Sequence, residues 1–242
     1  MVLVDSHCHL FDMKKGYMLP DDIFPVVVGF SHSSNRKAAE LAKAKGYPFV
    51  LGIAPQTAIK SDISHLDEWV EFIRESKPNA IGEVGLDYKW AIIKEHVERE
   101  KTVFSRMIGL ADEMGLPLVI HSRNNPADNE VPKDAVEDIM AMVKGKRVLM
   151  HFFSGTAEQA GRIVADGGYL SFTRMRSKEK RKAINTVPLD RILVESDAPY
   201  VGRTPDSIRE AIAYIAEVKG IGAEEVAEAT ARNAMGFFGF RV

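Results

Sequence analysis

The chain has 242 residues, 45% of them hydrophobic and 27% charged, with a formal net charge of −2 and a pI near 6.4. This ordinary globular composition excludes a globally basic surface, so a nucleic-acid partner would need a local patch or metal ions. The single cysteine, Cys8, excludes an internal disulfide and fits a reducing compartment, and the first residues do not resemble a signal peptide. No apolar run approaches the roughly 18 residues typical of a membrane span. We therefore expect a cytoplasmic protein without a membrane partner, large enough to be a stable monomer.

Short runs rich in β-branched and aromatic residues recur along the chain, and several are apolar on both alternating faces. Such runs are typical of strands buried in a parallel sheet that helices cover. The predicted strands span 2–7, 25–31, 49–55, 80–87, 116–123, 147–155, 169–173 and 191–199.

The segments between the predicted strands have helical patterns. Residues 95–114 place apolar side chains at spacings of three, four and seven. Thr204 and Pro205 resemble an N-cap followed by proline at the first helical position, and the apolar stripe that follows ends at Gly220. A last helix is predicted over 223–238.

Eight strands that alternate with helices predict a (β/α)8 barrel, the TIM-barrel fold, as one domain over residues 1–242. An open doubly wound sheet could use the same alternation, but no GxGxxG follows the first strand, which weakens a dinucleotide-binding interpretation. The irregular loop 124–132 could line a site or be a mobile connection.

Six ionisable side chains interrupt the apolar runs, and all lie toward the carboxyl ends of their predicted strands. They are His7, His9, Glu83, His121, His151 and Asp197. The carboxyl end of the strands is where active sites form in a (β/α)8 barrel. Burying so many ionisable groups is costly unless they are paired or bind metal.

His7 and His9 lie two residues apart on one strand, so both side chains point to the same face, where their ring nitrogens can converge on one ion. Cys8 would face the covering helices as a small core residue. Each residue has a structural alternative: Glu83 could be an ion-pair partner and Asp197 a helix N-cap. The set as a whole favours metal.

Four histidines and two carboxylates exceed what one catalytic zinc requires, and the number suits two ions. Glu83 could lie between the ions, with His7, His9 and Asp197 on one side and His121 and His151 on the other. The mixed nitrogen and oxygen donors fit Zn, Mn, Co or Fe more naturally than an all-oxygen Mg site. The identity of the two divalent ions stays open among these five.

These residues occur in strings that together resemble the TatD family of metal-dependent DNases, a branch of the amidohydrolase-like barrels. The strings spread over the whole chain in the family's order. They are VDSHCHL (4–10), IGEVGLDY (81–88), VIHSR (119–123), HFFSG (151–155) and LVESDAPY (193–200).

The resemblance implies a distorted barrel with a two-metal centre that hydrolyses phosphodiester bonds, typically of DNA. It assigns all six residues as ligands, with Glu83 shared between the ions. It also suggests Arg123 as a contact for substrate phosphate. Asp197, as a terminal ligand, would act as general base on a water whose pKa the ions lower, so Asp197 and Glu83 are the expected catalytic residues.

Some positions depart from the family pattern. The usual G-x-H-P after the third strand is GIAP (52–55) here, which places Ala54 where the family has histidine. The helix after the fourth strand has RE (99–100) in place of a glutamine-rich start, and the usual S-F-S-G after the seventh strand is SFTR (171–174). The ligands are retained, but the pocket around them is altered.

The basic run RMRSKEKRK (174–182) follows the seventh predicted strand on the same end of the barrel. A solvated helix face accounts for several of its charges, and Arg174 and Arg176 are the best candidates for contacts to nucleic-acid phosphates. The favoured function is thus a deoxyribonuclease acting on the end of a DNA strand. The alternatives are a small-molecule amidohydrolase, esterase or lactonase, or a tRNA deacylase, on the same centre, and last a metal-binding module without catalysis.

Overall fold

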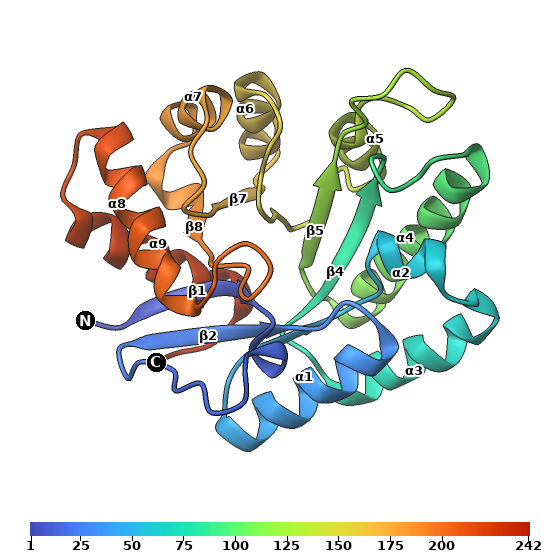
Figure 1. Cartoon of the computed structure of the whole chain (residues 1–242), viewed down its shortest axis with the longest axis horizontal. Coiled ribbons are helices and arrows are strands. Elements are labelled where there is room, and N and C mark those ends of the chain that lie inside the picture. Colours follow the sequence, from blue (N-terminus) through green and yellow to red (C-terminus); the bar gives the residue numbers. More distant parts are fainter.

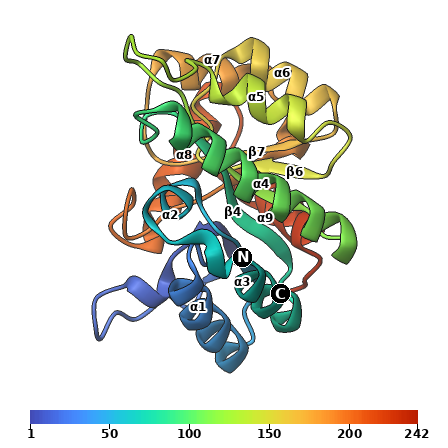
Figure 2. The same cartoon turned by 90° about the vertical axis from the view of Figure 1, so that its right-hand side faces the viewer.

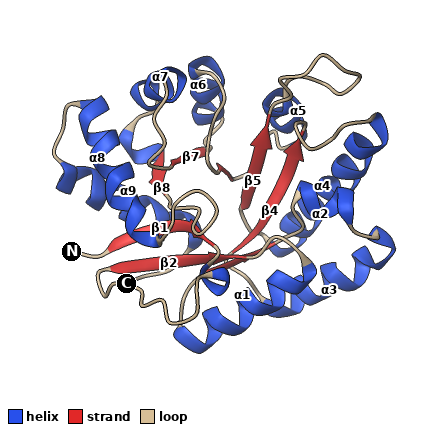
Figure 3. Ribbon diagram, viewed as in Figure 1, coloured by secondary structure: helices blue, strands red, loops and turns tan.

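Eight parallel strands follow one another around a barrel in the order of the chain, and helices cover the outside (Figures 1 and 3). The structure is a computed structural model that describes all residues from 1 to 242. The strands are β1 Leu3–Cys8, β2 Ile23–Val28, β3 Phe49–Leu51, β4 Ala80–Asp87, β5 Leu118–Arg123, β6 Val148–Met150, β7 Tyr169–Phe172 and β8 Ile192–Val194. The predicted fold class is confirmed.

The outer helices return the chain from each strand to the next, and Figure 2 shows α4 running across the front of the sheet. They are α1 His32–Lys45, α2 Pro55–Lys60, α3 Leu66–Ser76, α4 Lys94–Met114, α5 Ala135–Met142, α6 Ala157–Ala165, α7 Lys178–Thr186, α8 Ile208–Lys219 and α9 Ala223–Phe238. The predicted helices at 95–114 and 223–238 correspond to α4 and α9. No helix combines the length and the apolar character that spanning a bilayer requires.

Ladders join neighbouring strands from β1 to β8, and a short seam of single hydrogen bonds, without a ladder, joins β8 back to β1. Beyond β8, the Asp197 N–H donates to the His7 carbonyl at 2.9 Å and the His9 N–H donates to the Ala198 carbonyl at 2.8 Å. These two bonds connect the ends of β1 and β8 on the side where the predicted ligands lie.

Two apolar clusters hold the barrel together. A cluster of 50 buried residues lies between the strands and the outer helices. A second cluster of 12 buried residues combines valine, leucine and alanine side chains from the strands with Ala231, Ala234, Phe237 and Phe238 of α9. The strand and α9 residues of the second cluster form an apolar plug, which leaves the carboxyl ends of the strands to the polar side chains.

The strands β3, β6 and β8 are much shorter than predicted, and the backbone shows why. β3 ends at Leu51 because the next carbonyl, that of Gly52, accepts a hydrogen bond from the Asn35 side-chain amide at 2.9 Å instead of from a neighbouring strand. After β6 and β8 the chain leaves the extended region, with φ of +44° at Phe152 and +49° at Asp197. His151 and Asp197 therefore lie just beyond their strands, at the mouth of the barrel.

Candidate metal centre

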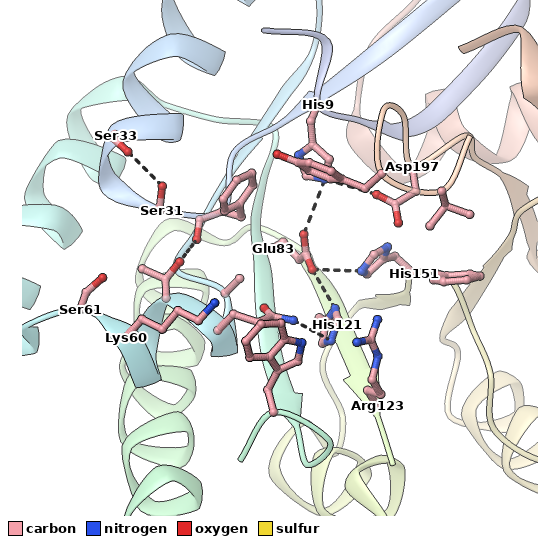
Figure 4. Close-up of a pocket in the computed structure, with 18 residues that line it drawn as sticks. His9, Ser31, Ser33, Lys60, Ser61, Glu83, His121, Arg123, His151 and Asp197 are labelled. Carbon is pink, nitrogen blue, oxygen red and sulfur yellow. Dashed lines mark hydrogen bonds and ion pairs between the residues drawn. The ribbon is translucent and has the colours of Figure 1, made fainter. Parts of the chain in front are cut away.

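The six predicted ligand residues converge at the carboxyl ends of the strands, around the Glu83 carboxylate. Figure 4 shows His9, Glu83, His121, His151 and Asp197 of this set. Glu83 Oε1 lies 2.8 Å from His121 Nδ1 and 3.3 Å from His151 Nε2. Glu83 Oε2 lies 3.6 Å from His7 Nε2 and 3.9 Å from His9 Nε2. A single carboxylate on β4 thus lies beside all four imidazoles of the predicted set.

Two groups of donor atoms are close enough to hold an ion each. His7, His9 and Asp197 form one group, and His7, Glu83 and His151 form the other, with the donor atoms of each group within 4.8 Å of one another. The first group matches the expected division. The second group shares His7 and does not include His121, which departs from the expected pairing of His121 with His151, although both of these histidines lie beside Glu83 Oε1.

Unpartnered ring nitrogens show that protein groups alone do not complete this cluster. Both ring nitrogens of His7 and both of His151 are buried and have no hydrogen-bond partner. Leaving buried polar atoms unpaired costs roughly 1–3 kcal/mol each. Imidazole nitrogens beside carboxylate oxygens are suitable donors for a divalent transition metal, so the residues present fit such an ion.

The charges of the cluster compensate for its burial. Burial opposes ionisation of Glu83, but the neighbouring histidines outweigh it and hold the pKa of Glu83 well below its ordinary value. Burial likewise opposes a charge on His151, and Glu83 and Glu195 raise its pKa well above the ordinary value. For Asp197, the hydrogen bond from His9 and the nearby histidines overcome burial and lower the pKa. The carboxylates are therefore ionised, and His9, His121 and His151, whose pKa values are raised, hold protons that a metal would displace. Burial and the neighbouring His151 instead lower the pKa of His7.

A surrounding set of groups fixes the orientation of the imidazoles. His9 Nδ1 lies 2.8 Å from the Val28 carbonyl. His121 Nε2 lies 2.8 Å from Asp87 Oδ2, and the Gln56 amide donates to the same oxygen at 2.8 Å. Such bonds set which ring nitrogen faces the centre, and here Nδ1 of His121 and Nε2 of His9 do so.

Asp87, Gln56 and Glu195 are supporting groups that the sequence motifs did not predict. Asp87 lies inside the string IGEVGLDY, so an acidic residue at the end of a buried strand was the available signal. Glu195, which lies 3.5 Å from His151 Nδ1, receives hydrogen bonds from the Ser171 hydroxyl and the Phe152 N–H. No sequence pattern distinguishes it from a structural acid.

A cavity of about 710 Å³ opens above the cluster (Figure 4). Arg123 lines it, as does Ala54, so the position that departs from the family motif borders the site. The cavity wall also includes Phe30, Ser31, Ser33, Gln56, Thr57, Lys60, Ser61, Trp90, Phe152, Tyr200 and Val201. Residues of the loop 124–132 do not line the cavity. A hydrogen bond within this loop, from the Asn125 amide to the Asn129 side chain at 2.7 Å, stabilises its conformation.

Arg174 and Arg176 lie outside this cavity, in contrast to Arg123. Arg174 Nη1 lies 3.6 Å from Glu210, and Arg176 donates to Glu217 at 2.7 Å while its guanidinium stacks 4.6 Å from the Tyr214 ring centre. The basic run is therefore attached to α8. Cys8 is buried and donates to the Val26 carbonyl at 3.7 Å, so it takes no part in the ligand cluster.

Comparison with known proteins agrees with the geometry. A sequence model described as TatD related DNase matches residues 4–239. The metal-dependent hydrolase YabD of Bacillus subtilis, described as uncharacterized, is 32% identical over 88% of this chain and 86% of its own. Deoxyribonuclease TATDN3 of Homo sapiens is 32% identical over 98% of this chain and 94% of its own.

Solved structures show the same fold at lower identity. The crystal structure of YJJV, a TATD homolog from Escherichia coli K12, has a TM-score of 0.80 at 23% identity, covering 99% of this chain and 98% of that one. A TatD family hydrolase from Entamoeba histolytica also has a TM-score of 0.80, at 18% identity, covering 98% of this chain and 97% of that one. The chain therefore belongs to the TatD related DNase family and is a metal-dependent hydrolase.

Proposed function

We propose that this protein is a deoxyribonuclease that hydrolyses phosphodiester bonds at the end of a DNA strand, with two divalent ions as cofactors. The observation that carries the proposal is the ring of four imidazoles and two carboxylates at the base of an open cavity whose wall holds Arg123. The names of the TatD relatives support a nucleic-acid substrate.

In this proposal the ligands are those predicted from the sequence. His7, His9 and Asp197 would hold one ion, His121 and His151 would hold the other, and Glu83 would be shared between them. When bound, such ions supply Lewis acidity to a phosphate oxygen and lower the pKa of water.

Asp197 is suited to accept the proton of the attacking water. Its Oδ1 faces His9 Nε2 at 3.3 Å, and its lowered pKa keeps the carboxylate available as a base near neutral pH. The backbone at Asp197 is fixed by its N–H bond to the His7 carbonyl, so the carboxylate is aimed before substrate arrives.

Arg123 would hold a non-reacting phosphate oxygen of the DNA strand. Its only ionic partner is the buried Asp87, at 3.7 Å from Nη1, so the remaining guanidinium donors are free to face the cavity. A planar guanidinium binds two phosphate oxygens at once, which orients the diester.

The test is incubation of the purified protein with end-labelled single-stranded DNA and Mn²⁺ or Mg²⁺, with Asp197→Asn as the comparison. Shortening of the strand by the wild type, with a loss of at least about 100-fold in the Asn variant, supports the proposal. Intact DNA after prolonged incubation with either ion would contradict it.

A small-molecule hydrolase on the same centre is the second candidate, and Ala54 is the observation that favours it. Ala54 is buried in the cavity wall where the family motif has histidine, so this part of the wall lacks an imidazole donor for a phosphate. Turnover of esters, lactones or aminoacyl-tRNA without any cleavage of DNA would favour this candidate.

A further inference from the structure

A large aromatic side chain is exposed on the rim of the cavity. Trp90 lines the cavity and is 43% exposed, although an indole is a side chain that proteins usually bury to a greater extent. The other tryptophan of the chain, Trp69, lies on α3 and stacks on His32, 5.8 Å between ring centres, away from the cavity.

The backbone at Trp90 is anchored to a residue that contacts the metal cluster. Its backbone N–H donates to Asp87 Oδ1 at 3.1 Å, while Oδ2 of the same carboxylate lies 2.8 Å from His121 Nε2. One buried side chain therefore fixes both a ligand imidazole and the turn that carries the indole. A rim residue anchored in this way can set the position of a substrate with respect to the reacting bond.

The surroundings of Trp90 are cationic. Lys60 Nζ lies 3.8 Å from the centre of the Trp90 ring, and Lys60 is exposed and has no carboxylate partner. Arg123 lines the same cavity. The only acidic residues of the cavity wall are Glu83 and Asp197, which belong to the metal cluster. The charge beside Trp90 thus complements a phosphodiester backbone.

We infer that Trp90 is a stacking platform for a base adjacent to the scissile phosphate, and that Lys60 contacts the phosphate of that nucleotide. The inference rests on the proposed nuclease function and names the part of the substrate that the rim recognises. Stacking on an aromatic ring is tolerant of sequence because every base has a π-face. The platform therefore favours a single-stranded end whose bases are unpaired, with little preference among the four bases.

Fluorescence tests the stacking directly, because the chain has only two tryptophans. Trp69→Phe leaves Trp90 as the only indole, and Trp90→Phe leaves Trp69. Titration with oligothymidylate that carries hydrolysis-resistant phosphorothioate linkages should quench the emission of the Trp69→Phe variant and leave that of the Trp90→Phe variant unchanged. Quenching confined to Trp69, or none with Trp90 alone, would overturn the inference.

Steady-state kinetics distinguish stacking of a DNA base on Trp90 from contacts to the DNA backbone. Trp90→Ala should lower kcat/KM on end-labelled single-stranded DNA by about 5- to 150-fold, and Trp90→Phe should restore most of the loss. On a strand with abasic nucleotides around the cleaved bond, wild type and Trp90→Ala should be equal. Equal rates on normal DNA would refute the platform alone, whereas absence of DNA cleavage by the wild type would refute the nuclease proposal.

Salt dependence tests Lys60. In a plot of log affinity against log salt concentration, Lys60→Gln should reduce the slope by about 0.7, the value for one phosphate of a single strand. Lys45→Gln is the matched control, because Lys45 is an exposed lysine in the last turn of α1. An unchanged slope in Lys60→Gln, or an equal change in both variants, would remove Lys60 from the inference.

Discussion

Replacement of Asp87 by asparagine is the sharpest test of how the centre is oriented. Asp87 is fully buried; Oδ2 accepts from Gln56 and lies 2.8 Å from His121 Nε2, while Oδ1 accepts from the backbone N–H groups of Lys89 and Trp90. An asparagine has one oxygen and one amino group in the same space. In either orientation, the amide NH2 group of the asparagine takes the place of a carboxylate oxygen and faces groups that donate hydrogen bonds to that oxygen in the wild type.

The consequence for His121 is a change of tautomer. If the amino group faces His121, Nε2 becomes an acceptor and the proton moves to Nδ1, the atom that faces Glu83. A protonated Nδ1 cannot bind metal. If the amino group instead faces the backbone, two N–H groups lose their acceptor. Loss of one charge-assisted hydrogen bond corresponds to about 1.5–3 kcal/mol, or about 10- to 150-fold in metal affinity.

The assay is a competitive titration of Zn²⁺ or Mn²⁺ against a chromophoric chelator. Asp87→Asn should raise the Kd for metal about 10- to 100-fold, in the range typical of groups that orient metal ligands. Glu100→Gln is the control, because Glu100 Oε2 accepts only from the Asp87 backbone N–H at 3.2 Å and a glutamine oxygen can keep that bond. A Kd for Asp87→Asn within twofold of the wild type would refute the tautomer argument.

Three other predictions concern charge and protonation. Arg123→Lys should lower kcat/KM on DNA about 10-fold, because an ammonium cannot reproduce the two-donor fork, and an unchanged rate would exclude the phosphate contact. Metal affinity should rise from pH 6 to pH 8, because a metal must displace the protons of His9 and His151. Burial lowers the pKa values of these two histidines, but the nearby carboxylates outweigh burial and raise them. Calorimetry in buffers of different ionisation heat should show proton release on metal binding, and equal heats in all buffers would contradict the prediction. Burial raises the pKa of Glu100 to about 8, above its ordinary 4.5. The contribution of the protonated carboxyl to the free energy of unfolding is therefore fully present below pH 4.5 and is lost as pH rises through about 8. The free energy of unfolding of the wild type relative to Glu100→Gln should therefore fall between pH 5 and pH 9, and a constant difference would be inconsistent with a buried neutral carboxyl.

The sequence was sufficient for the order of the elements and for the convergence of the ligand residues. Parallel strands and a barrel place all carboxyl ends at one mouth, so His7, Glu83 and His121 had to approach one another once the strands were assigned. The same reasoning did not place Asp87 against His121. That contact depends on the register of β4 and β5, which shifts between Ile81 and Val84 and pairs Asp87 with Arg123.

The basic run shows a different limit of sequence reasoning. Six basic residues in nine suggested a contact surface for phosphates, but a neighbouring helix supplies acids for several of them. Glu210 and Glu217 lie seven residues apart on α8, so both face α7 and the segment before it, where they pair with Arg174, Arg176 and Arg181. Charge in a run is informative only when the opposite charges on the packed neighbour are known.

The short seam between β1 and β8 determines when the enzyme can become active during synthesis. His7 and His9 leave the ribosome early, but their backbone partners are Asp197 and Ala198, and Ser196 donates to Asp5 across 191 residues of chain. Contacts of such long range form only after the last strand has emerged. A nascent or truncated chain that ends before this strand lacks Asp197 and the bonds that hold the end of β1, so it cannot assemble the proposed metal centre.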